Sequence, residues 1–173
     1  MLSEYLNDRI MKGLSKSELL QSSSPLIIST IRRIADALVY ELKHEVLAEG
    51  VHVERLYASQ IDDRLEDTMH GQLQVFVVPR QEEYLPLDRT SNKYHGTIDI
   101  VFSQELNRNV MRQMDTLLTV IECVTDRFRL KRLDTYHLAR CIKVIHSVGE
   151  YSSMGFHDDK FVSELTMIFE QAR

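Results

Sequence analysis

The chain has 173 residues, a length typical of one domain rather than two. Its apolar share of 43% is that of a globular protein, which excludes an extended disordered chain. The 21 basic residues are outnumbered by 26 acidic ones, and this balance argues against a general nucleic-acid binder, whose phosphate contacts need a basic excess. The N-terminus is polar where a secretory signal would be apolar, and charges interrupt every apolar stretch. We therefore expect a protein made in the cytoplasm, with no membrane span.

Residues 1–24 are expected to form a short helical appendage. Ser3 can cap a first short helix, and Ser15 and Glu18 have the spacing of a capping box. The segment has few apolar residues, so we expect it to dock on the body or on a neighbouring subunit and to be partly disordered alone. Residues 25–173 then make a single domain.

The first long helix is predicted to begin at Ser24 and Pro25, because serine is a good N-cap and proline suits the first helical position. Gly50 is placed to end it. Apolar residues recur between these points at spacings of three and four, which predicts one core-facing stripe. They are Ile27, Ile28, Ile31, Ile34, Ala35, Leu38, Leu42 and Val46.

Beyond Gly50 the pattern alternates with a period of two, which predicts strands. Residues 51–57 form a moderate candidate, and residues 73–78 form a strong one that Pro79 is expected to end. The connection between them is predicted to be a solvated acidic loop, because it lacks the ligand pattern of a calcium loop. Its acidic residues are Asp62, Asp63, Glu66 and Asp67. Residues 79–93 are predicted to form a long charged loop, and loops of that length are usually functional or disordered.

Alternation returns over residues 94–102, and this strand is expected to pair antiparallel with residues 73–78. An amphipathic helix is predicted over 107–128, followed by strands over 138–148 and 161–169. This order predicts an α+β domain, with a mostly antiparallel sheet of four or five strands and two long helices packed on one face.

Chemistry-bearing motifs are missing from this pattern. Cys123 and Cys141 lie in apolar segments and are predicted to be buried free thiols. The tightest polar cluster is His157, Asp158 and Asp159, which we interpret as a capped turn, and His146 is interpreted as a structural histidine. Nucleotide-binding loops, nucleophile elbows and zinc-ligand spacings are lacking, so no catalytic, cofactor-binding or metal-binding residue is predicted.

A locally basic segment follows the second long helix. We interpret it either as solvated surface or as a protein interface, and rank contact with DNA below both. A helix C-terminus favours cations through its dipole, so part of the cluster needs no partner. Its members are Arg127, Arg129, Lys131, Arg132, Arg140 and Lys143.

Four segments in order resemble the tail terminator, or tail completion, proteins of long-tailed bacteriophages. They are a strand ending in Val-Val-Pro (LQVFVVPR, 73–80), an aromatic-led alternating strand (YHGTIDIV, 94–101), a helix (MDTLLTVIE, 114–122), and a Tyr-Ser turn at 151–152 before a phenylalanine-led strand (FVSELTMIF, 161–169). The likeness covers about residues 26–171 and leaves the first 24 residues unmatched.

This resemblance implies a non-enzymatic α+β subunit that forms a ring, typically a hexamer. The ring sits in the virion at the head-proximal end of the tail, where it stops polymerisation of the tail tube and presents a surface to the head-tail connector. The implied partners are other copies of the chain, the tube protein and the connector proteins. Two alternatives remain: a head-closure or neck protein of the same phages, and a small enzyme. An enzyme would need titratable groups with perturbed pKa values gathered in an apolar pocket.

Eight charged residues are candidates for the protein interface. In the predicted loop, we expect contact with the tube or an adjacent subunit through Arg80, Glu82, Glu83, Arg89 and Lys93. In the basic segment, the candidates to pair with carboxylates of another subunit are Arg129, Lys131 and Arg132. The competing interpretation of the loop is a solvated hairpin with no partner.

Overall fold

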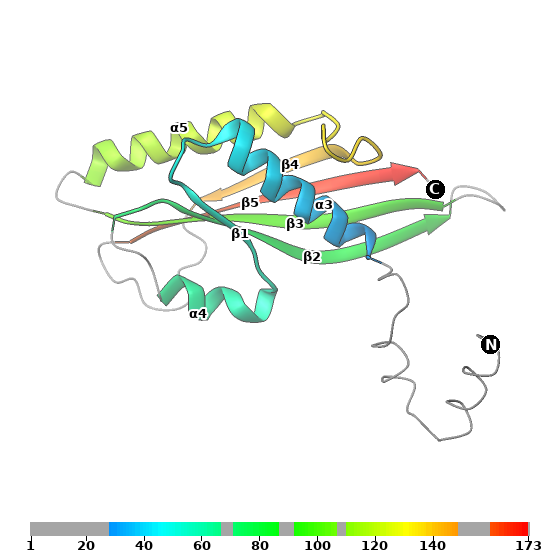
Figure 1. The fold of residues 1–173 in the computed structure, drawn as a ribbon, viewed down its shortest axis with the longest axis horizontal. Coiled ribbons are helices and arrows are strands. Elements are labelled where there is room, and N and C mark those ends of the chain that lie inside the picture. Colours follow the sequence, from blue (N-terminus) through cyan, green and yellow to red (C-terminus); the bar gives the residue numbers. More distant parts are fainter. Residues whose placement is uncertain (1–27, 67–70, 87–91, 107–109, 149–159, 173) are drawn as a thin grey trace, which may run out of the picture.

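A computed structural model of the chain describes residues 28–66, 71–86, 92–106, 110–148 and 160–172. They form one five-stranded sheet with the strand order β1-β2-β3-β5-β4 (Figure 1). The short edge strand β1 (His52–Arg55) runs parallel to β2 (Gln74–Pro86), and the remaining pairs are antiparallel. The α+β class and the mostly antiparallel sheet are therefore as predicted. The appendage at 1–24 lies outside the described residues.

The centre of the sheet is formed by β2 and two further long strands. β3 (Asn92–Glu105) pairs on one side with β2, and on the other with β5 (Lys160–Ala172). β4 (Arg140–Val148) lies outside β5 and forms the second edge. The predicted strands in these regions are confirmed, and all but the one at 138–148 extend further than the sequence pattern indicated.

The prediction that Pro79 ends a strand is wrong, and the predicted loop is wrong for residues 79–86 and 92–93, which are strand. β2 continues through Pro79 to Pro86, paired with β3 along its length, with one irregularity in the register at Arg80. β1 pairs only with residues 74–77, so β2 is an edge strand at Pro79. Proline is tolerated on edge strands and at bulges because its missing N–H removes no ladder hydrogen bond there. Residues 87–91 lie outside the described residues.

Two long helices cover one face of the sheet (Figure 1). They are α3 (Thr30–Glu41), which continues into a π-helical turn over Leu42–Val46, and α5 (Val110–Phe128). Gly50 follows the first with a positive φ of 94°, a conformation that favours glycine. The expected start of this helix at Ser24 and Pro25 lies outside the described residues.

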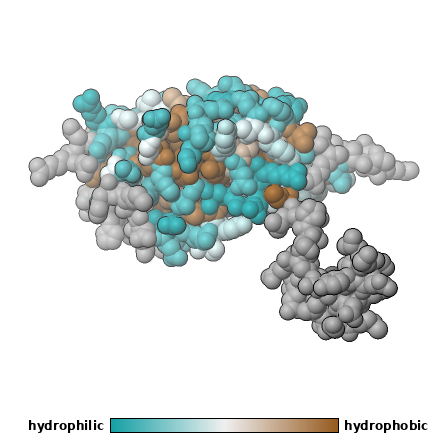
Figure 2. Space-filling view, in the orientation of Figure 1, coloured by the Kyte–Doolittle hydropathy of each residue, from teal (hydrophilic) through white to brown (hydrophobic). Residues whose placement is uncertain are grey.

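The main core lies between these helices and the inner face of the sheet. Each large apolar side chain fully buried here contributes about 1.5–3 kcal/mol. In the view of Figure 2, hydrophilic residues cover most of the helical side, and apolar ones show mainly in its middle. The principal core residues are Ile34, Leu38, Leu42, Val75, Val77, Ile98, Ile100, Phe102, Leu117, Ile121, Val124, Phe128, Leu165, Met167 and Phe169.

The opposite side of the sheet, which we name the open face, carries a second and smaller apolar cluster. There Leu56, Ile61, Phe76, Val78 and Val101 pack together beneath the short helix α4 (Ile61–Glu66). A 3₁₀ turn over Ala58–Gln60 leads into α4.

The prediction of a loop over residues 62–67 is therefore wrong for residues 62–66, which are helical. Asp67 lies outside the described residues. Asp62 and Asp63 occupy the first turn of α4, where acidic side chains are favoured by the helix dipole. Among the described residues, no helix is both long and apolar enough to cross a membrane.

Candidate interface surfaces

The distal half of β2 is a projecting edge, and we name residues 81–86 the acidic arm. All six residues are exposed, and they include Glu82 and Glu83 but no cation. Tyr84 and Leu85 retain 51% and 36% of their accessible surface. In the described part of the chain, no strand runs along the outer edge of β2 beyond Val77. The acidic arm is thus an open strand edge, and such edges are sites of pairing with other chains.

The acidic arm is anchored to the body of the domain. One carboxylate oxygen of Glu82 accepts hydrogen bonds from the backbone N–H of Ile31, at 3.3 Å, and from the hydroxyl of Tyr94, at 3.1 Å. The rings of Tyr84 and Tyr94 meet edge to face, with centroids 5.3 Å apart. At Gly96 a Cβ atom would lie 2.7 Å from the Tyr94 hydroxyl, so the buried tyrosine needs glycine beside it. These contacts make the arm a fixed feature of the fold.

Arg80 lies where the register shifts, and its side chain turns to the open face. Its guanidinium pairs with the buried carboxylate of Asp99, which also accepts a hydrogen bond from the Thr166 hydroxyl at 2.8 Å. Burial and the neighbouring Asp99 raise the pKa of Glu164, and Arg80 opposes that shift. Arg80 therefore stabilises acidic groups of its own domain.

Of the other residues predicted to lie in the loop, Glu83 and Lys93 are at one end of the β2–β3 pair. Lys93 pairs with Glu170 at 2.7 Å. Glu83 is exposed and makes no ion pair with any described residue. Arg89 lies outside the described residues. Glu83 is thus the predicted interface residue of this group whose charge is not already engaged within the described part of the domain.

The opposite edge of the sheet carries a basic surface. We name it the basic edge, and it consists of residues 129–132, Leu138, Arg140 and Lys143, all of them exposed. The backbone N–H of Cys141 donates to the carbonyl of Lys131 at 2.9 Å, which fixes the segment after α5 against the start of β4. Arg132 donates to the carbonyl of His137 at 2.8 Å. All three residues predicted here, Arg129, Lys131 and Arg132, lie on this surface.

Two exposed leucines lie within the basic edge. Leu130 and Leu138 retain 55% and 57% of their accessible surface. Leu130 also has a positive φ of 59°, in the left-handed region that non-glycine residues rarely adopt. Neither leucine is among the predicted interface residues. The only signal for Leu130 was its position between Arg129 and Lys131 in a run of charges.

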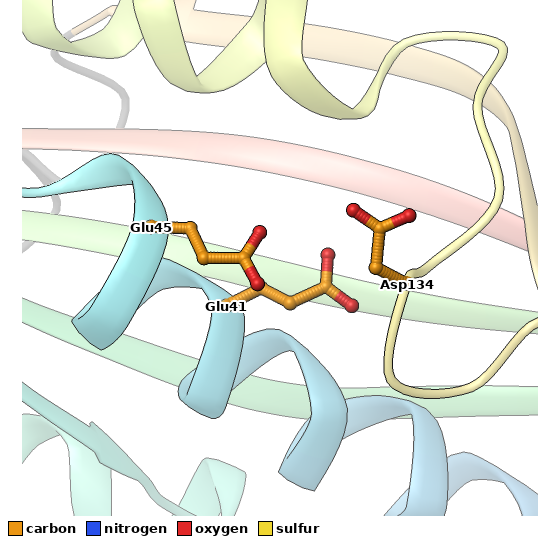
Figure 3. A group of neighbouring side chains, drawn as sticks. All are labelled: Glu41, Glu45 and Asp134. Carbon is orange, nitrogen blue, oxygen red and sulfur yellow. The ribbon is translucent and has the colours of Figure 1, made fainter.

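Arg127 belongs to a different arrangement, a set of ion pairs within the domain. Its guanidinium lies 2.7 Å from Glu45, 2.5 Å from Asp134 and 3.7 Å from the buried Glu41. Figure 3 shows these three carboxylates. The hydrogen bonds that Arg127 donates to Glu45 and to Asp134 raise the pKa of its guanidinium. One oxygen of Glu41 accepts from the backbone and hydroxyl of Thr135. The three carboxylates are close enough together to hold a metal ion, but Arg127 supplies the cation there.

The part of the sequence from α5 to β4 also holds His146 and the two cysteines, Cys123 and Cys141. His146 lies 2.7 Å from the Ser163 hydroxyl, as expected of a structural histidine, and burial lowers its pKa. Burial raises the pKa of the Cys141 thiol to about 11. Cys123 is exposed, so the prediction of two buried thiols is correct only for Cys141. Cys123 lies off the buried stripe of α5 formed by Leu117, Ile121 and Val124. The cluster at 157–159 is outside the described residues.

A scan against models of known protein families gives no match for this chain, and a search of curated proteins likewise gives none.

Proposed function

We propose that this chain is a structural subunit of a phage virion. In this proposal copies of the chain form a ring on the head-proximal end of the tail tube. The ring stops tube polymerisation and offers its other side to the head-tail connector. The protein acts by shape and repeated docking, and no bond-making step is assigned to any residue.

The observation that carries this proposal is the acidic arm. Its anchors, Glu82 and the Tyr84–Tyr94 pair, hold an exposed strand edge in a fixed position. A ring subunit needs such an edge, because every copy must offer one surface to each neighbour. The ordered resemblance of four segments to tail terminators supports the assignment to this class of ring.

Loss of the protein from infected cells tests the proposal. In the phage that encodes this chain, an amber mutation in its gene should yield tails longer than wild type and without attached heads. Purified protein added during tail assembly should restore the normal length. A neck protein would behave differently, because its loss leaves tails of normal length that have not joined heads. Normal tail length in the mutant therefore overturns the terminator proposal.

A further inference from the structure

We propose that neighbouring copies in the ring contact each other through the acidic arm of one copy and the basic edge of the next. Glu83 and Arg140 form the centre of this contact. The inference rests on the proposed ring function for its setting, and it names the partner of the arm as a second copy of this chain.

The two surfaces carry opposite charge. The acidic arm holds two carboxylates and no cation, whereas the basic edge holds five cations and no carboxylate. Tyr84 and Leu85 on the arm, and Leu130 and Leu138 on the edge, add exposed apolar surface to both sides. Each surface thus combines charge with apolar area, as protein interfaces do, and the two charges are opposite in sign.

The sheet register places the two surfaces at the same position along the strand direction. Glu83 is opposite His95, His95 is opposite Glu170, and Glu170 is opposite Arg140. Glu83 and Arg140 are therefore the two ends of one row that crosses the sheet, and both lie on its open face. A neighbour displaced along this row brings its Arg140 to Glu83 without a large shift along the strands.

Strand direction supports the same arrangement. β2 and β4 are separated by β3 and β5, and three successive antiparallel pairings make β2 and β4 run in opposite directions. A second copy in the same orientation therefore aligns its β4 antiparallel to β2. At Arg140 the backbone edge of β4 already pairs with residues 131–133, so the contact there is made by side chains. Because the contact uses two different surfaces, repeating it leads to a ring where the rotation closes.

Leu130 supplies an independent sign of function at the basic edge. A left-handed conformation costs a branched apolar residue free energy, and its exposure leaves its apolar surface in water. The left-handed backbone is a common end of a helix such as α5, where glycine is usual. The presence of an exposed leucine there instead is explained if a partner covers its side chain. We therefore expect Leu130→Gly to stabilise the isolated subunit against urea and to weaken its self-association.

Charge reversal tests the contact, with assembly of the full chain followed by sedimentation velocity over a range of concentrations. Glu83→Lys and Arg140→Glu should each weaken assembly at least about tenfold, because each places like charges across the contact. An equimolar mixture of the two variants should assemble again, because every contact is then between opposite charges. Asp115→Lys and Arg112→Glu, exposed on α5, are matched controls and should assemble like wild type.

The possible outcomes separate this inference from the proposed function. If wild type assembles and the two reversals leave assembly unchanged, or their mixture fails to recover it, the contact is wrong and the ring proposal stands. A wild-type chain that remains monomeric up to about 1 mM also overturns the contact. If recovery occurs but tail length is normal without the gene, the contact holds and the terminator proposal fails.

Discussion

The carboxylate of Glu82 in the acidic arm accepts a hydrogen bond from the backbone N–H of Ile31, in the first turn of α3 and 51 residues earlier in the chain. This contact joins the projecting edge of the sheet to the start of a core helix. A negative charge at a helix N-terminus is favourable, and here the same oxygen also accepts from Tyr94.

Replacement of Glu82 should therefore lower stability through both contacts. We expect Glu82→Gln to cost about 0.5–1 kcal/mol in urea unfolding, since it removes the charge but keeps an acceptor oxygen. Glu83→Gln is the matched control, because Glu83 is the exposed neighbour with no ion pair among described residues. Equal stability of the Glu82→Gln variant and wild type would show that the arm is not held in this way.

Removal of the guanidinium of Arg127 should have a larger effect. Arg127→Met leaves the buried Glu41 facing Glu45 and Asp134 without a cation, and we expect a loss of about 3 kcal/mol at neutral pH. Asp134→Asn removes an exposed partner and should cost less than about 1 kcal/mol. Urea unfolding of both variants measures the difference, and similar losses would contradict the central role of Arg127.

Glu164 should make stability depend on pH. Its pKa is raised in the folded protein, so the folded state holds this proton more tightly than the unfolded state. The resulting stabilisation is full below the ordinary pKa of about 4.5 and is lost as pH rises through the raised pKa. Glu164→Gln should remove this pH dependence and leave the protein equally or more stable at pH 7, because the repulsion from Asp99 is gone.

Urea unfolding at pH 4 and pH 7 checks this prediction. Glu170→Gln, on the same strand and face, is the control, and its loss of the pair with Lys93 should lower stability slightly at pH 7. A Glu164→Gln variant that is clearly less stable than wild type at pH 7 would contradict the account of this cluster.

The fold was largely predictable because its core residues recur at the spacing of a helix or a strand within each element. The buried stripe of α5 and the alternation of Phe161, Leu165, Met167 and Phe169 both appear at the expected spacing. Pro79 was misjudged because the effect of a proline depends on whether its N–H would face a neighbouring strand. The short β1 leaves that side of β2 open, and the parallel pairing of β1 is a long-range property.

The candidate surfaces were predictable as charges but not as an arrangement. The row from Glu83 to Arg140 depends on two shifts of register, at Pro79/Gln81 and at Cys141/Lys143. One inserted residue in either strand turns every later side chain to the other face. Arg127 was grouped with its basic neighbours, because its acidic partners Glu41 and Glu45 are more than 80 residues away in the chain.

The mass of the native assembly tests the central claim most directly. Measured by native mass spectrometry during dilution, the full chain should give one discrete multiple of its 20.2 kDa subunit mass, as a closed ring does. The resemblance to tail terminators implies a hexamer. A chain that is monomeric throughout, or a ladder of species that grows with concentration without closing, would contradict the account.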